Sequence, residues 1–263
     1  MVSERNRSLA LIELLQSKNI TINIGKNKAR GNNGIFIYKN DNFRIDISKN
    51  ITESEKIKVI LHEYAHFIHY KYDHTLNSLD FIFDNLTDDE NEELLKITIE
   101  KIPTTLALKL CNKKEKYKSD IKYFTKLIRN EFHDFNATKK YNKIEKKLPK
   151  LAKLLLKHDL INYNNQLINL VNICTFYPNL NKNELNYIKL FSTKRKLNRI
   201  NNRISKLNNY YNKPTELFAR FIETYFVEKN KCLKLAPLLT QKIEKIINNK
   251  LIYELNEIND IFE

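Results

Sequence analysis

Residues 52–72 read TESEKIKVILHEYAHFIHYKY, and we expect the fold to be organised around this stretch. Thr52 and Glu55 have the spacing of a capping box, in which each side chain bonds the backbone amide of the other residue. Apolar residues then recur at helical spacing and cover one broad face, namely Ile57, Ile60, Leu61, Tyr64, Ala65 and Ile68. The pattern predicts a buried helix over about residues 53–72.

Three residues of this helix, His62, Glu63 and His66, form the pattern HExxH. Histidines at i and i+4 lie one above the other on a helix face, so both imidazoles can reach one ion. Imidazole suits Zn²⁺, and three protein ligands plus a water give an open catalytic site. Glu63 would take a proton from that water and pass it to the leaving amine. We therefore expect a zinc peptidase that acts on a protein or peptide substrate, with Glu63 as general base.

A catalytic zinc ion needs a third protein ligand, and the other histidines are weak candidates for it. His69 lies one turn beyond His66, but a single straight helix rarely wraps three ligands round one ion. His69 also occupies the position where the metzincin pattern requires glycine, which excludes that pattern. His74 lies past the predicted helix end, and His133 and His158 fall in lysine-rich segments, where surface positions are expected.

Glu216 is the stronger candidate for the third ligand. Its neighbours Leu217, Phe218, Phe221 and Ile222 predict a buried helix that begins near Pro214. A buried carboxylate needs a metal or a cation as partner. On the same face lie Ala219, which is small enough for close approach of the HExxH helix, and two further charged residues, Arg220 and Glu223. Glu223 remains a second possible member of the metal shell, and Arg220 a partner for the acids.

The segment Tyr211–Arg220 reads YNKPTELFAR, and its combination with HEYAH resembles zincin-like metallopeptidase domains of phages and mobile elements. Those domains pair an HExxH helix with a later PxELFAR helix and often occur in large polyvalent proteins. A more distant similarity is to ImmA/IrrE-type peptidases. The resemblance covers about residues 20–74 and 205–230. It implies a gluzincin-like site in which His62, His66 and Glu216 bind zinc and Glu63 is the general base.

Two tyrosines directly before the Glu216 helix, Tyr210 and Tyr211, are candidates for a further role. The tetrahedral oxyanion of peptide hydrolysis requires a hydrogen-bond donor besides the metal. We assign this catalytic role to Tyr211, with Tyr210 as its neighbour to be tested. Ordinary packing is the alternative for both.

The remaining sequence predicts an α+β protein that is mostly helical. Three β-rich runs, at 20–24, 34–38 and 43–47, predict a small antiparallel sheet, and the last of them could offer an edge to an extended peptide. A helix is expected at about 3–17, helices throughout about 75–209, and one amphipathic helix over 238–262. The expected organisation is a catalytic core from 1–74, a large helical insertion from 75–205, and C-terminal helices from 206–263 that complete the metal site.

The net charge of +15 suggests an alternative function. Residues 109–157 hold sixteen basic side chains against five acidic ones, interspersed with aromatic rings, and this segment could follow a phosphate backbone. The alternative is therefore a zincin scaffold or basic helical module that binds nucleic acid, with little or no proteolysis. A solvated lysine face docked on the acidic residues 80–100 would explain the charge without any such partner.

The three cysteines, Cys111, Cys174 and Cys232, are widely spaced and form no CxxC pattern. They are expected to be free thiols in a reducing compartment, so a metal site must use His, Glu and Asp. The sequence shows no targeting segment and no apolar run long enough to span a membrane. A cytoplasmic location is expected.

Overall fold

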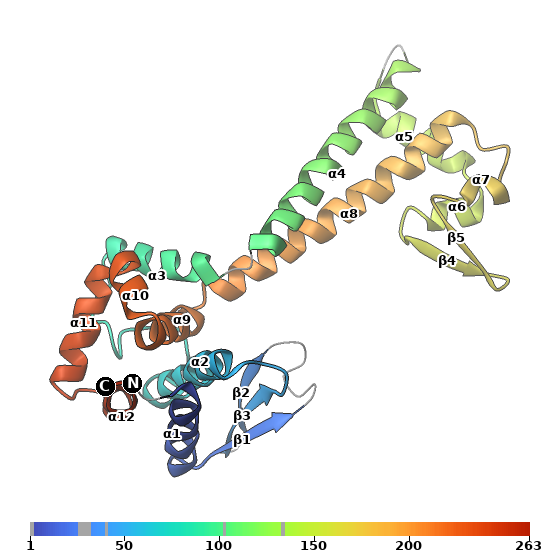
Figure 1. The fold of residues 1–263 in the computed structure, drawn as a ribbon. Helices are drawn as coiled ribbons and strands as arrows, with labels where there is room; N and C mark the ends of the chain where they lie inside the picture. The colour runs from blue at the N-terminus through green and yellow to red at the C-terminus, as the bar shows by residue number, and fades with distance from the viewer. Residues whose placement is uncertain (1–2, 26–32, 40–41, 102–103, 133–134) are drawn as a thin grey trace. The chain divides into compact units, whose positions relative to one another are not determined.

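The computed structural model describes residues 3–25, 33–39, 42–101, 104–132 and 135–263. The chain forms two compact units. Unit 1 comprises Met1–Ile102 and Asn208–Glu263, and unit 2 comprises Pro103–Leu207 (Figure 1). Helices predominate, with one sheet of three strands and one of two, so the predicted α+β class is confirmed.

The three-stranded sheet of unit 1 follows α1 (Glu4–Ser17) and contains β1 (Ile20–Gly25), β2 (Gly34–Lys39) and β3 (Asn42–Ser48). All three strands lie where the sequence predicts them, but the pairing is mixed. The strand order is β1-β3-β2, with β1 parallel to β3 and β2 antiparallel to it. The wholly antiparallel prediction is therefore wrong for β1, because pairing between distant strands leaves no local signal in the sequence. β3 is paired on both sides, so among the described residues the free edges belong to β1 and β2 and not to residues 43–47.

The central helix α2 (Glu53–Tyr72) has the predicted bounds, and its capping box between Thr52 and Glu55 is formed on both sides. It packs against β2 and β3 of the sheet and against α9 (Pro214–Val227). Apolar side chains of both helices are buried between them, and Ala219 of α9 is completely buried there. The absence of a larger side chain at this position lets the two helices approach closely.

Helix α3 (Asp88–Lys101) also belongs to unit 1, because it packs against α9, α10 (Lys229–Leu235) and α11 (Pro237–Asn248). The Glu93 carboxylate accepts hydrogen bonds from the backbone amides of Leu238 and Leu239, at 3.2 and 3.0 Å, where α11 begins. Unit 1 therefore extends to residue 102. The predicted domain boundary after residue 74 comes too early.

The C-terminal segment forms two helices, α11 and α12 (Tyr253–Phe262), where one was predicted over 238–262. Between them Lys250 has φ of 53°, a left-handed conformation that a continuing helix does not allow. The single-helix prediction is wrong because the apolar periodicity persists through this break.

Unit 2 begins with α4 (Thr104–Asn130), α5 (Ala137–Lys147) and α6 (Lys150–Leu154), and it ends with α7 (Ile173–Phe176) and most of α8 (Lys182–Tyr211). Its own apolar core includes Ile128 of α4, Ile144 of α5 and Ile188 of α8. Between α6 and α7 lies a hairpin of β4 (Leu160–Tyr163) and β5 (Gln166–Asn169). The prediction that this region is helical throughout is therefore wrong.

The hairpin had a local signal. Asn164 and Asn165 occupy the turn with φ of 49° and 60°, the positive values that a two-residue hairpin turn requires and that asparagine tolerates. None of the helices in the described part of the chain is long and apolar enough to cross a membrane.

Candidate metal centre

The two helices at the centre of unit 1 bring His62, His66 and Glu216 together. The Nε2 atom of His62 lies 3.5 Å from Oε2 of Glu216, and the Nε2 atom of His66 lies 3.5 Å from Oε1 of the same carboxylate. One ligand atom from each of the three residues lies within 4.8 Å of the others, so the group could hold a metal ion. The predicted proximity of Glu216 to the HExxH histidines is confirmed.

The distances fit a shared ion better than direct hydrogen bonds. Hydrogen bonds join N and O atoms at about 2.7–3.2 Å, shorter than these contacts. Ligands bound at about 2.0–2.1 Å around a tetrahedral zinc ion lie roughly 3.3 Å apart, close to the separations here. The Glu216 side chain is buried, and its Oε2 has no hydrogen-bond partner among the described residues. A buried, incompletely satisfied carboxylate facing two imidazoles is what a metal site needs.

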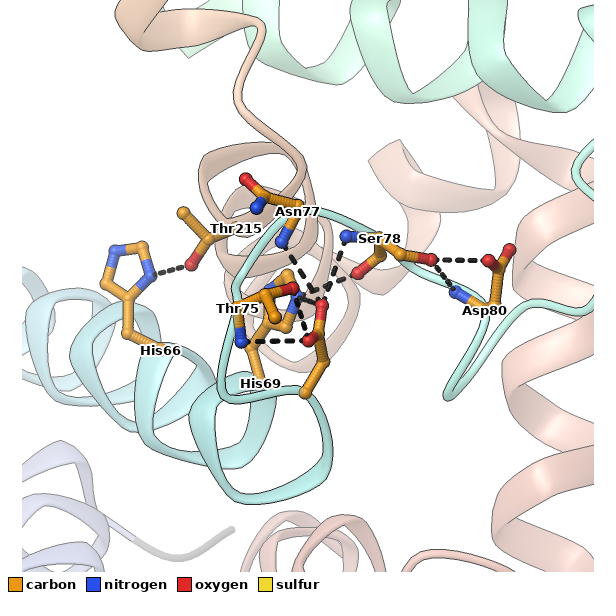
Figure 2. Close-up of polar contacts among 8 residues, drawn as sticks. His66, His69, Thr75, Asn77, Ser78, Asp80 and Thr215 are labelled. Atoms are coloured by element: carbon orange, nitrogen blue, oxygen red, sulfur yellow. Dashed lines mark hydrogen bonds and ion pairs between the residues drawn. The ribbon is translucent and has the colours of Figure 1, made fainter.

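The second ring nitrogen of each histidine faces an oxygen atom of α9. Nδ1 of His66 lies 2.7 Å from Oγ1 of Thr215 (Figure 2), and Nδ1 of His62 lies 3.4 Å from Oε2 of Glu223. When each Nδ1 carries the proton, it can donate to these oxygens, and each Nε2 is left with a free lone pair. Such partners fix the tautomer and the ring orientation of a metal ligand.

Three residues of α9 therefore converge on the site. Thr215 and Glu216 lie in its first turn and Glu223 two turns later, which returns Glu223 to the face of Glu216. The sequence placed Glu223 on the correct face. It gave no indication of Thr215, whose role depends on the position of His66 on another helix.

The electrostatics of the metal-free site are coupled. Burial alone would lower the pKa of His62, but the carboxylates of Glu216 and Glu223 outweigh it and raise that pKa to about 9. Burial alone would raise the pKa of Glu216, but the two histidines outweigh it and hold that pKa far below its usual range. Without metal the site is therefore an ionised carboxylate against a protonated imidazole.

Glu63 is buried beside this group and faces the first residue of β2, Gly34. A Cβ atom at Gly34 would lie 2.3 Å from Cγ1 of Val59 and 2.9 Å from Oε1 of Glu63. A side chain is therefore excluded there, and the backbone of β2 lies directly over the catalytic glutamate predicted from the sequence. This role of Gly34 was not predicted from the sequence, although a glycine in a strand can mark a close approach.

Two hollows adjoin the site, and together we call them the groove. The larger has a volume of about 360 Å³ and includes His62, Arg220 and Glu223 in its lining. The smaller has about 270 Å³ and is lined on one side by the β2 residues Gly34, Ile35 and Phe36, with His66 and Glu216 opposite. Both hollows share Gly34, Glu63 and Tyr210. The groove therefore passes Glu63 and follows the free edge of β2.

The structure gives Tyr210 and Tyr211 different surroundings. The Tyr211 ring lies 4.8 Å from the Arg220 guanidinium, whose Nη2 is 3.8 Å from Oε2 of Glu216. Tyr210 lines both hollows, and burial together with the Glu216 carboxylate raises its pKa. Tyr210 rather than Tyr211 thus has its hydroxyl among the acidic groups of the site.

The other histidines lie outside the group. Nε2 of His69 is 2.8 Å from the carbonyl oxygen of Ser78 (Figure 2). The Asp73 carboxylate organises the same loop by accepting hydrogen bonds from Thr75, Asn77 and Ser78. Burial lowers the pKa of His69. His74 and His158 are exposed, and His133 lies outside the described residues. His69 is buried and bonded to the loop after α2, outside the group of His62, His66 and Glu216.

Comparison of the chain with protein-family models, with curated proteins and with solved structures finds no match.

Proposed function

We propose that this protein is a zinc-dependent metallopeptidase. The observation that carries the proposal is the convergence of the His62, His66 and Glu216 ligand atoms beside Glu63, at the base of a groove. The HExxH helix and the PxELFAR helix supply these residues, which supports placement among the zincin-like peptidases with a glutamate ligand.

In this proposal His62, His66 and Glu216 hold the zinc ion. The ion would lower the pKa of a water molecule to about 7 and polarise the scissile carbonyl. Glu63 accepts a proton from the attacking water and then donates it to the amine released when the C–N bond breaks. Thr215 and Glu223 keep the two imidazoles oriented, and the Tyr210 hydroxyl is placed to donate a hydrogen bond to the developing oxyanion.

The free edge of β2 favours a peptide over a small molecule as substrate. An extended chain can add to an exposed strand through main-chain hydrogen bonds, and side-chain pockets then give specificity. The groove follows this edge past Glu63. A substrate strand on β2 would bring one of its carbonyl groups to the metal.

The test is Glu63→Gln, which removes the base but keeps the shape of the side chain. Zinc content should stay at one ion per chain, while cleavage should fall by about 10²–10⁴-fold. A comparison of new protein N-termini generated in a proteome by wild type and by Glu63→Gln measures cleavage without a known substrate. Equal cleavage by both proteins would overturn the mechanism, and a protein that binds no zinc would overturn the metal site.

Tyr210→Phe and Tyr211→Phe form a matched pair for the oxyanion donor. Removal of one such donor typically costs about 10²–10³-fold in turnover. We expect this loss for Tyr210→Phe and little change for Tyr211→Phe, once a cleaved peptide from the proteome comparison is available as substrate. A loss confined to Tyr211→Phe would restore the assignment made from the sequence.

A further inference from the structure

The two units differ in net charge. Unit 2 contains 24 lysine and arginine residues against 7 aspartate and glutamate residues, a net charge of +17. Unit 1 contains 22 against 24, a net charge of −2. The entire excess of positive charge in the chain therefore belongs to unit 2.

A general bias of the chain towards lysine does not explain this difference. Such a bias adds cations everywhere, but it does not remove acids from one part of the chain. Acidic residues number 7 among the 105 of unit 2 and 24 among the 158 of unit 1. The depletion of acids is therefore specific to unit 2, and it points to a function of its surface.

The cations of unit 2 include two regular stripes. The α4 stripe consists of Lys122, Lys126 and Arg129, and the α5 stripe consists of Lys139, Lys143 and Lys146. Each has the spacing i, i+4 and i+7, which places its three side chains on one helix face. All six residues are exposed. In the described part of unit 2 the ion pairs are made by other cations, namely Lys118, Arg195 and Arg199.

The apolar faces of both helices are already covered. Ile128 of α4 and Ile144 of α5 are buried in the core of unit 2. A helix that binds a membrane surface needs its apolar face free to enter the lipid. These helices instead present cations on flexible stems, which suit a partner with regularly spaced negative charges on its outside.

We infer that unit 2 binds nucleic acid through the phosphate backbone, and that the α4 stripe and the α5 stripe supply phosphate contacts. Lysine and arginine side chains bind phosphates without reading base sequence, so binding is general rather than sequence-specific. This activity is separate from the proposed peptidase chemistry, because it uses no residue of the metal centre.

The first experiment is a salt titration of the full-length protein with a fluorescent duplex of about 30 base pairs, followed by anisotropy. Each neutralised phosphate contributes about −0.9 to the slope of log affinity against log salt. Six contacts therefore predict a loss of about 10³-fold between roughly 50 and 200 mM salt. No binding, or binding that salt does not weaken, would overturn the inference.

The second experiment locates the contacts with three triple variants, each losing three positive charges. Glutamine replaces all three residues of the α4 stripe in one variant and of the α5 stripe in another. The control replaces Lys49, Lys234 and Lys245, which are exposed in unit 1. Each stripe variant should bind at least about tenfold more weakly, with a slope shallower by roughly 2–3, and the control should change little.

Equal weakening by the control would show that only total charge matters and would overturn the assignment to unit 2. A competition experiment with vesicles of anionic phospholipid tests a membrane as the alternative partner. If the protein stays on them in the presence of excess duplex, the basic surface serves a membrane and the inference fails. Release of the protein by the duplex supports the inference.

Discussion

Unit 1 and unit 2 place their charged side chains in opposite ways. Among the described residues, unit 1 buries seven acidic side chains and one histidine, whereas unit 2 buries a single acid, Glu184. Unit 2 carries its charge almost entirely outside, around an apolar core. Burying an ion costs several kcal/mol unless partners hold it. Each buried charge of unit 1 therefore needs partners that hold it.

Several of those charges have ordinary structural partners. Glu254 is bonded by Lys71 and by the Tyr72 hydroxyl, and Glu90 by Lys242. Glu93 is bonded by the first amides of α11, and Asp46 by Asn23 and Arg44. The remaining glutamates, Glu63, Glu216 and Glu223, surround the two histidines of the HExxH motif. Three of the seven buried acids of unit 1 therefore lie in the candidate metal centre.

The largest expected effect comes from Glu216→Ala. Loss of a direct ligand should lower zinc affinity by more than the roughly 10–100-fold that follows loss of a supporting partner. Zinc at about 1,000 times its Kd should add about 4 kcal/mol to the free energy of unfolding of the wild type and almost nothing to that of the variant. Chelator competition and denaturant unfolding measure the two quantities.

Glu184→Ala is the matched control, since it removes the one buried acid in the described part of unit 2. Zinc affinity should be unchanged. A similar loss in both variants would show that buried acids act through general stability, and the contrast between the units would disappear.

The next largest effect is the dependence of zinc affinity on pH. The pKa of His62 is raised to about 9 in the metal-free protein, and zinc binds only the neutral ring, so binding releases one proton. Affinity should rise about tenfold per pH unit from pH 7 and level off near pH 9, roughly 100-fold in total. The stability that the raised pKa gives the metal-free protein is complete below about pH 6.5 and is lost as pH rises through about 9.

Titration calorimetry in buffers of different ionisation enthalpy counts the released protons. Affinity that is independent of pH between 7 and 9 would mean that His62 is already neutral, contrary to its position between two carboxylates.

A smaller loss is expected for Glu223→Gln, which weakens the support of His62 without removing a ligand. Zinc affinity should fall by about 10–100-fold. The rise of affinity with pH should also level off at a lower pH, because one of the carboxylates that raise the pKa of His62 is gone. An unchanged affinity would show that the 3.4 Å contact between Glu223 and His62 does not orient the ring.

Thr215→Val should cost less, about tenfold in zinc affinity, because a neutral hydroxyl supports His66 more weakly than a carboxylate would. Thr215→Ser keeps the hydroxyl and should restore most of the affinity. Chelator competition again gives the measurement, and an equal loss in Thr215→Ser, which keeps the hydroxyl, would show that the hydroxyl does not account for the effect.

The smallest expected effect on zinc is that of Ile188→Ala, in the core of unit 2. The cavity should destabilise unit 2 by about 2–5 kcal/mol. Zinc affinity should change less than about twofold, because the metal centre lies in unit 1 with a core of its own. Proteolysis of unit 2 and metal titration of the same sample separate the two effects, and a joint loss would contradict the independence of the units.

The parts of the fold with local signals were predictable from the sequence. Helix α2 has the predicted bounds because its capping box fixes the start, and its period places His62 and His66 on one face. Glu216 was identified because apolar neighbours made a solvated position improbable. The turn of the β4–β5 hairpin also had a local signal in Asn164 and Asn165, but its short apolar strands did not distinguish strand from helix.

The parts that depend on two distant segments were not predictable. The pairing of β1 with β3 and the passage of Gly34 over Glu63 follow from tertiary packing. The distinction between Tyr210 and Tyr211 depends on how α8 ends beside the groove. The support of His66 by Thr215 likewise requires the relative rotation of α2 and α9, which no single helix encodes.

The insertion of unit 2 between α2 and α9 also has a consequence in time. Glu216 follows His66 by 150 residues, so the ribosome makes both histidines long before the carboxylate. At about 5–20 residues per second, this interval lasts roughly 8–30 s. The cluster of His62, His66 and Glu216 is therefore incomplete for as long as unit 2 is being synthesised. It can form only after unit 2 has been made.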